Sequence, residues 1–500
     1  MATGDFTQWS TIAPLMGTLP TWLGAEDAQR LEAYRLYEQM YDNVPDTYKL
    51  VQRGTDAQPI YIPTPKIIVE ATNRFLATGY NFMVNPRIGT PQDQALVQNA
   101  ISQLFKRELF YAKFSTQKRY GLIRGDAVWH LVGNPLKAEG TRVSIYEVDP
   151  GSYFPIYDVD NVEKIVGCHL ADRIKVGDDN LIRRQTYRKD LERGVITSET
   201  TLWEEGKWDD RNLLPEDLSQ VGVVVPLFDL PPAITSLPVY HIKNSRIPGA
   251  PFGGSELKGI ERLAGAVNQA ISDEELSLAL DGIGVYATTS GPPTDGEGNE
   301  VNWRLGPGRV AELGGEDDKF WRVNGVGSVA PYLDHVRFIM GTMQQSAAVP
   351  DIAAGNVDVT VAESGIALSL QLAPILAKNA EKEQEMLGVY DHMLYDLVQM
   401  WLPSYEGMPT GIATEVVSLI DDPMPVNRDV RVAEILQLVT AKIVSIEYAR
   451  EELAKFGYRF PENMGETVVA ETAALSEAQV GDVFGSRAAD ELNVNAETAV

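Results

Sequence analysis

Apolar side chains recur at helical spacing through the first 125 residues, and this pattern predicts a series of amphipathic helices. One helix follows Glu26 and Asp27, whose acidic side chains suit a first turn. Another opens at Pro65, because proline is tolerated at the start of a helix. The expected helices cover about 26–41, 65–76, 90–105 and 114–123.

From Ala127 onward the spacing of apolar residues changes to about two, which is typical of strands. Turn-forming residues separate the apolar runs, as at 149–151 and 177–180. Strands that follow one another without intervening helices indicate an antiparallel sheet, so we expect residues 1–250 to form an α+β lobe. The expected strands are 128–132, 143–148, 165–170, 181–187, 195–203 and 237–242.

The most distinctive stretch runs from Gly253 to Leu402. A helical pattern over 255–280 leads into a short insert rich in glycine and proline, and a second helical pattern follows over 329–347. Two helices with a small β lobe between their tips form a scaffold that projects the lobe from a main body. This arrangement favours a role in assembly over catalysis.

The start of this stretch carries several local signals. The glycine-rich residues 248–254 predict a hinge, and Ser255 is the expected N-cap, with Glu256 in the first turn. Gly259 and Gly265 each weaken the helix by roughly 1 kcal/mol relative to alanine. They suit the close approach of a neighbouring element.

The insert between the two helices reads as a small sheet. Residues 281–287 predict one strand, 291–298 an exposed turn, and 309–313 and 320–323 two further strands. A sheet of this size is marginally stable alone. We therefore expect it to depend on a neighbouring lobe, in this chain or in another copy.

A polar segment and a long helix follow the second helix. Residues 353–361 lack bulky anchors and are expected to be mobile. The pattern over 364–401 predicts a helix, and Pro374 is expected to kink it, because an internal proline costs roughly 3 kcal/mol.

The last hundred residues combine a connector, helices and an acidic end. Residues 403–428 read as a connector, and 430–440 with 445–456 as a short helical hairpin. Residues 462–500 carry eight acidic residues and one basic residue, which favours a frayed or disordered tail.

Composition narrows the class of protein. A chain of 500 residues, 44% hydrophobic and 23% charged, is long enough for two to four lobes with ordinary cores. Its formal charge of −27 argues against a free-standing nucleic-acid binder and against an anionic membrane surface as a partner. Apolar runs reach neither membrane-helix length nor a signal-peptide pattern. We expect a soluble, intracellular chain.

The usual catalytic and metal-binding motifs are missing from the sequence. The single cysteine, Cys168, lies in an apolar run and is expected to be a buried core thiol. The turn 253–255 lacks the Gly-Lys-Ser/Thr ending of a phosphate loop. Metal-ligand spacing is also missing among the histidines, of which the first three lie in expected strands and suit structural roles; they are His130, His169, His241, His335 and His392. We expect no catalytic residue, metal or cofactor.

Two kinds of charged cluster leave alternatives open. The acidic clusters 272–275, 315–318 and 420–422 offer metal-binding carboxylates, but a solvated face is the favoured interpretation. A basic run interleaved with aromatic residues either touches nucleic acid or pairs with acidic residues on a neighbouring subunit. The second interpretation is favoured, because the chain as a whole is so acidic. The run comprises Lys106, Arg107, Lys113, Lys118, Arg119 and Arg124.

The order of these elements resembles the portal proteins of tailed bacteriophages, of the siphophage type. These proteins form the ring at one capsid vertex through which DNA enters and leaves. Local sequences in the same order carry the resemblance over most of the chain: 63–76, 253–280, 349–352, 363–370, 427–434 and 443–449.

The resemblance implies a portal-like α+β subunit with several domains. It assigns a wing to 1–252, stem helices to 253–281 and 328–347, a clip to 282–327, a tunnel loop to 348–362, a long wing or crown helix to 363–402, and a crown with an acidic tail to 403–500.

The function implied is that of a non-enzymatic structural protein of the virion, at the portal vertex, assembled in the host cytoplasm. The ring would be a dodecamer that conducts DNA during packaging and ejection. Its partners would be the terminase large subunit, a head-completion or adaptor protein, the major capsid and scaffold proteins, and double-stranded DNA, with no membrane.

Residues with implied roles fall in two groups. The tunnel loop facing DNA would present Asp351, Asn356, Asp358 and Thr360. The docking surface of the clip would present Asp295, Glu297, Arg304, Glu316 and Asp317.

Elementary physics agrees with the resemblance on two points. Stem helices with apolar stripes need copies of themselves beside them, which a cyclic ring provides. An acidic channel also does not grip phosphates, and the acids at 351 and 358 argue against a tight grip on DNA by the loop. The rival interpretations are another head-structural protein and an acidic cytosolic enzyme with paired carboxylates.

Overall fold

The computed structural model describes much of the chain. The chain divides into two compact units, 1–423 and 424–500. The described residues are 25–51, 59–158, 160–161, 164–176, 179–190, 192–204, 227–283, 285–294, 297–301, 313, 315–323, 330–355, 365–421, 423, 428–455, 458, 464 and 468. Most of the expected strand 309–313 and most of the acidic tail lie outside them.

The helices expected in the first 125 residues are confirmed. They are α2 (Ala25–Tyr41), α3 (Thr64–Phe75), α4 (Pro91–Arg107) and α5 (Phe110–Arg124), with a short 3-10 turn η3 (Pro45–Thr47). The Thr90 side chain caps α4 by accepting a hydrogen bond from the Asp93 amide. Helix α5 ends at Arg124 and is capped by Gly125, whose φ of +100° lies in the left-handed region that glycine adopts without strain.

The strands expected after Ala127 are also confirmed, and all their pairings are antiparallel, but they form two sheets. The three-stranded sheet has the order β3-β2-β9, and the five-stranded sheet has the order β4-β5-β6-β7-β8. The sequence patterns missed β4 and β8. The strands are β2 (Asp126–Gly133), β3 (Val143–Val148), β4 (Tyr153–Tyr157, after the 3-10 turn η4, Pro150–Ser152), β5 (Ile165–Val176), β6 (Asp179–Lys189), β7 (Ile196–Glu204), β8 (Leu227–Asp229) and β9 (Val239–Lys243).

The long helix expected near 364–401 is α9 (Gly365–Asp396), which continues through Pro374 into a π-helical turn η7 (Leu397–Trp401) and then α10 (Leu402–Glu406). The segment expected as a plain connector contains a strand, β12 (Val416–Leu419). It pairs with β1 (Asn81–Val84) from far earlier in the chain. That pairing was not predictable from local patterns.

An aromatic cluster joins these elements. The Phe105 and Phe110 rings stack with centroids 3.9 Å apart, and Phe110 also stacks on Trp129 of β2 at 5.0 Å. The Trp129 indole donates a hydrogen bond to the Tyr390 hydroxyl on α9 over 3.0 Å. The core of the first unit therefore lies where α4, α5, the three-stranded sheet and α9 meet, and the chain has the α+β fold that the sequence predicts.

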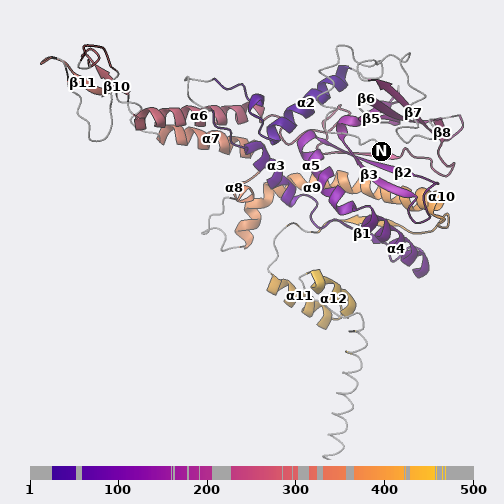
Figure 1. Ribbon diagram of the computed structural model, residues 1–500. Coiled ribbons are helices and arrows are strands. Elements are labelled where there is room, and N and C mark those ends of the chain that lie inside the picture. The colour runs from indigo at the N-terminus through magenta and orange to yellow at the C-terminus, as the bar shows by residue number, and fades with distance from the viewer. Residues whose placement is uncertain are drawn as a thin grey trace, which may run out of the picture. The chain divides into compact units, whose positions relative to one another are not determined.

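The projecting helices are α6 (Glu261–Ile283) and α7 (Ala330–Ser346), which lie side by side (Figure 1). Between them in sequence, β10 (Val285–Thr288) and β11 (Phe320–Val323) form a two-stranded antiparallel sheet. Helix α6 begins at Glu261, so the expected start at Ser255 is wrong: residues 256–259 form a turn instead. The short helix α8 (Asp351–Ala354) follows α7.

The second unit contains the expected helical hairpin. Helices α11 (Arg428–Thr440) and α12 (Ile446–Lys455) pack against each other. Ile435 and Ala449 are buried in it.

Gly133 offers a test of the packing. A Cβ placed there would lie 2.2 Å from ring atoms of Tyr405. We expect Gly133→Ala to lower the free energy of unfolding by about 2 kcal/mol through overpacking. Urea unfolding measures this change.

Gly388, an exposed position of α9, is the matched control, because a Cβ there meets no atom within 4 Å. Gly388→Ala should stabilise the chain by about 0.5–1 kcal/mol, since alanine favours the helix. Equal effects of the two substitutions would contradict the contact with Tyr405.

Candidate functional site

His130, His169, His241 and the cysteine have structural roles, whereas His335 and His392 are exposed. His130 contacts the Tyr187 hydroxyl at 2.9 Å, and His169 contacts the Thr186 hydroxyl at 2.8 Å. Burial lowers the pKa of His130 to about 3 and that of His169 to about 4, so both are neutral at pH 7. His241 meets Asp126 at 2.7 Å, and Cys168 is fully buried, where burial raises the pKa of its thiol. The expected structural roles are confirmed.

Across the described ranges, no group of three or more His, Cys, Asp or Glu side chains is placed to hold a metal ion. Within the same ranges, no helix is long and apolar enough to cross a membrane. The acidic cluster 272–275 is not wholly a solvated face, because Glu274 is buried on α6.

Most of the basic run bonds to groups of its own chain, a role that neither interpretation of it included. The guanidinium of Arg124 is buried and pairs with Asp149 and Glu38. Arg119 pairs with Glu70, and Lys113 with Glu108, both at 3.1 Å. Arg107 donates to the backbone carbonyls of Gly140 and Val143, Lys118 donates to those of Asn73 and Leu76, and Lys106 is exposed.

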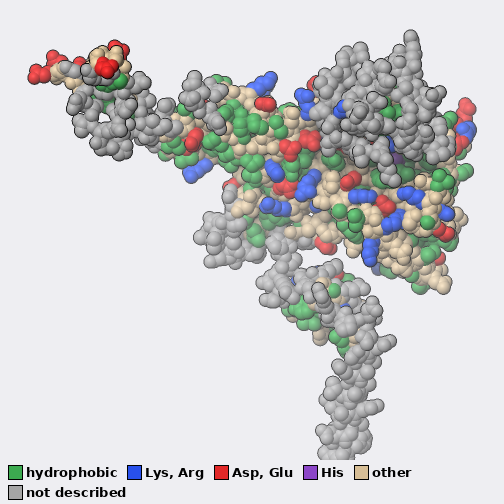
Figure 2. Space-filling model, in the orientation of Figure 1, with side chains coloured by type: hydrophobic (Ala, Val, Ile, Leu, Met, Phe, Trp, Pro, Cys, Tyr) green, Lys and Arg blue, Asp and Glu red, His purple; other side chains and the backbone are tan. Residues whose placement is uncertain are grey.

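The α6–α7 pair leaves large apolar side chains uncovered. Helix α7 buries Val336, Ile339 and Met343, which recur at helical spacing. Phe338, about half a turn around the helix from Val336, is 71% exposed, and Leu278 on α6 is 43% exposed. Figure 2 shows hydrophobic side chains along this pair among charged ones. The pair thus has apolar surface on more sides than its own packing uses.

Side chains of α6 hold backbone amides of the N-terminal region. The Asn268 carboxamide accepts from the Ile62 amide at 2.8 Å, and the Ser272 hydroxyl accepts from the Ile60 amide at 2.9 Å. The Gln269 carboxamide accepts from the Val51 amide at 2.7 Å. These three hydrogen bonds satisfy backbone amides of the N-terminal region and tie α6 to that region.

A buried ionic cluster lies at the base of the pair. Glu256, in the turn before α6, accepts a hydrogen bond from Lys378 Nζ at 2.7 Å and also pairs with Lys382. The Asn244 amide donates to the same carboxylate at 3.1 Å. Burial alone would raise the pKa of Glu256, but the two ammonium groups outweigh it and lower the pKa to about 2. Glu256 is thus a buried anion in the turn before α6, so its expected place in the first helical turn is wrong.

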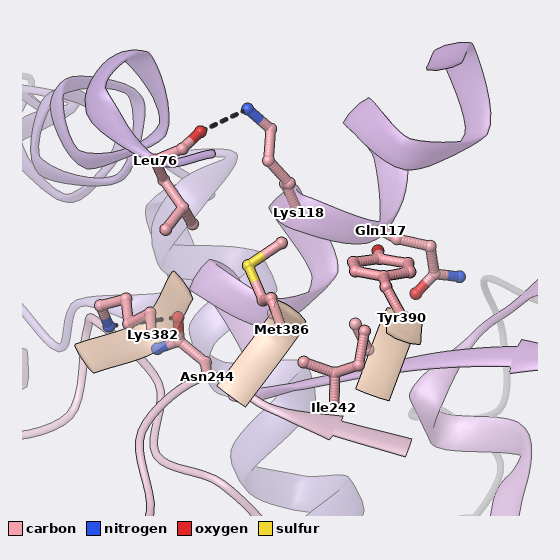
Figure 3. A pocket seen from close by; sticks show the side chains of 10 residues that line it. Leu76, Gln117, Lys118, Ile242, Asn244, Lys382, Met386 and Tyr390 are labelled. Carbon is pink, nitrogen blue, oxygen red and sulfur yellow. Dashed lines mark hydrogen bonds between the residues drawn. The ribbon is translucent and has the colours of Figure 1, made fainter. Parts of the chain in front are cut away.

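A small cavity adjoins this cluster (Figure 3). Its volume of about 20 Å³ accommodates a single water molecule. Met386, Tyr390 and Ile242 provide apolar walls, while Lys382 and Lys118 point their ammonium groups to Asn244 and to the Leu76 carbonyl. The cavity is too small for a substrate and belongs to the packing around the cluster.

The expected hinge is held in place. The Gly253 amide donates to Asp126 at 2.8 Å, and the Gly254 amide donates to the Ser245 carbonyl at 2.9 Å. Gly259 has no neighbour within 4 Å of its Cβ position, so its expected role in close approach is wrong; its φ of +95° explains a glycine there. Gly265 does face a neighbour, Tyr48.

The expected clip residues are only partly described. Glu297, Glu316 and Asp317 are exposed near the β10–β11 sheet. Asp295 and Arg304 lie outside the described residues. The sheet also carries a stacked pair, Tyr286 and Phe320, with ring centroids 5.3 Å apart, and Trp321 is 46% exposed.

The start of the expected tunnel loop is packed against the body, and most of the segment expected to be mobile, 356–361, lies outside the described residues. Asp351 opens α8 and is exposed, but Val349 and Ala353 are buried, and α8 contacts α3 and α9. Asn356, Asp358 and Thr360 lie outside the described residues.

Comparison with known proteins finds no matching family model and no matching curated protein. Among solved structures, a chain in the virion of a native gene transfer agent particle is 12% identical, with a TM-score of 0.44, covering 90% of this chain and 99% of that chain. A chain in the neck of the native particle, computed with C12 symmetry, is 14% identical, with a TM-score of 0.43 and coverage of 89% and 98%. A chain in the neck of the empty particle, computed with C6 symmetry, is 13% identical, with a TM-score of 0.44 and coverage of 90% and 99%. With TM-scores below 0.5, these similarities do not assign a function to this chain.

Glu256→Gln leaves two buried ammonium groups facing a neutral amide. We expect it to lower the free energy of unfolding at pH 7 by about 3 kcal/mol. Because the pKa of Glu256 is held below the usual 4.5, its stabilisation is present above pH 4.5 and is lost as the pH falls toward 2. Urea unfolding of both proteins across this range should show the difference shrinking in acid.

Glu385→Gln is the matched control, because its partner Arg246 is largely exposed. An exposed pair contributes less than about 1 kcal/mol. A loss at Glu256 no larger than this would contradict the structural importance of the buried cluster.

Proposed function

We propose that this chain is the subunit of a portal ring, the channel through which DNA enters and leaves a phage-like capsid. The observation that carries the proposal is the α6–α7 pair, which bears a small sheet between its helices and leaves Phe338 and Leu278 exposed. The resemblance of the sequence to portal proteins supports the same assignment.

A ring accounts for the uncovered apolar surface. In a cyclic assembly each subunit meets its neighbour through two different surfaces, so the exposed side of α7 in one copy is covered by α6 of the next. Covering a phenylalanine side chain stabilises a contact by about 1.5–3 kcal/mol. Repeated around a dodecamer, this contribution makes the closed ring the favoured state.

Each part of the chain has a proposed task. The α6–α7 pair is the stem, the lobe at 282–327 docks the terminase motor and later a head-completion protein, and 348–362 faces DNA. The capsid and scaffold proteins surround the ring at the portal vertex of the virion. The proposal assigns no catalytic activity or cofactor to the chain.

The charge of the chain fits a passage rather than a binding site. At −27 overall, and with Asp351 exposed at the start of the loop, the protein would repel phosphates rather than hold them. Within the described residues, most cations of the basic run are engaged by their own chain. DNA would therefore slide without being gripped.

Electron microscopy of the purified protein tests the proposal. We expect rings with a central hole for the wild type. Phe338→Asp should prevent ring formation by placing a charge in the subunit contact, with sedimentation velocity reporting monomers. A wild-type chain that stays monomeric at high concentration would contradict the portal assignment.

Arg337→Ala provides the control for that substitution, because Arg337 is on the same turn of α7 and its side chain is 76% exposed. This variant should assemble like the wild type. If Phe338→Asp forms rings as well as the wild type does, the subunits meet through a surface other than Phe338, and the portal assignment stands.

Deleting Asn356–Thr360 tests the proposed DNA-facing loop. Rings should form normally, because the stem and the body are unchanged, whereas DNA packaging or retention in an assembly assay should fall. Loss of the ring itself in this variant would show that the loop is structural.

A further inference from the structure

Lys378 on α9 bonds to several separate segments of the first unit. Its ammonium donates to Glu256 Oε2 at 2.7 Å, to the Ala347 carbonyl at 2.7 Å and to Thr72 Oγ1 at 3.1 Å. A lysine has three N–H donors, so these acceptors use all of them. The acceptors belong to the turn before α6, the end of α7 and the body of α3.

The contact at Ala347 meets a structural need. The last carbonyls of a helix have no partner within it, and a lysine is a suitable cap because it also offsets the negative end of the helix dipole. The next residue, Ala348, has a φ of +51°, which is costly for alanine. Lys378 thus holds a strained turn that leads directly into Val349 and α8.

Lys382 provides an internal comparison. It stands one helical turn further along α9 and pairs with the same Glu256 carboxylate, but its other partner is Asn244, at 3.2 Å. Among the residues that the structure describes, Lys382 bonds to Asn244 and Glu256 and to neither α7 nor α3. The two lysines therefore share the ionic bond and differ in what else they hold.

We propose that Lys378 is a coupling residue, which ties the base of α6, the end of α7 and the segment 347–355 to α9 so that they shift as one body. Lys382 stabilises the fold but does not take part in this coupling. All the contacts lie within one chain, so the inference stands whether or not the chain forms a ring. Lys378 acts as a positioning residue: it sets where the segment after α7 begins.

Amide hydrogen exchange of the full-length chain tests the coupling. In Lys378→Met, we expect exchange at residues 347–355 to become about tenfold faster than in the wild type. Exchange in β2, which lies in the core, should change only as much as global unfolding requires. Ring formation is scored separately by electron microscopy, so failure of the coupling and failure of the proposed function are distinguishable.

Lys382→Met is the matched variant. It removes a buried ammonium from the same carboxylate and should destabilise the fold globally, yet leave local exchange at 347–355 unchanged relative to β2. Equal local exchange in the two variants, or no local change in Lys378→Met, would overturn the proposal.

Thr72→Val keeps the test available if Lys378→Met fails to fold. This substitution preserves the shape of a fully buried side chain and removes one acceptor of Lys378. We expect a smaller increase in exchange at 347–355, about threefold. Unchanged exchange there would overturn the proposal as well.

Discussion

A carboxylate buried in a protein has to be matched by positive charge, and Glu256 imposes this constraint on the base of the projecting helices. Lys378 and Lys382 supply the charge from α9, and Asn244 adds an amide donor from the end of β9. The cluster can form only if the turn before α6, the three-stranded sheet and α9 occupy fixed positions. Its ionic bonds therefore locate the helix pair on the body.

A second buried network secures the sheet side of the same body. Arg124 at the end of α5 pairs with Asp149 and with Glu38 of α2, and Asp126 of β2 accepts from the Gly253 amide. The segment before α6 is thus held at two points: Gly253 bonds to Asp126, and Glu256 bonds to the two lysines of α9. A subunit that presents helices to neighbouring copies needs the start of the helix pair to be fixed and its apolar side chains to be exposed, and α6 and α7 meet both conditions.

The segment after α7, which is proposed to face the channel, is also held by α9. Because the Ala347 carbonyl is bonded to Lys378, the position of α8 depends on α9 as well as on α7. A displacement of the helix pair would reach the following segment through these contacts. The structure thereby links the surface proposed to meet other subunits with the segment proposed to face DNA.

Elements with strong local signals were predictable from the sequence alone. Apolar periodicity predicted α3, α4, the long helix α9 and the α11–α12 hairpin, and alternation predicted β2, β3 and β5 to β7, because these signals arise from neighbours along the chain. The packing of a projecting helix pair was predicted too, as was the burial of Cys168. Lys378 and Lys382 lie one turn apart on α9, but the same run carries Glu381, Glu383 and Glu385, so the sequence does not mark the two lysines as partners of a buried anion. Three contacts became visible only in the folded chain: Glu256 with the two lysines, β1 with β12, and Arg124 with Asp149. Each joins segments that lie far apart in the sequence, and no local pattern encodes their proximity.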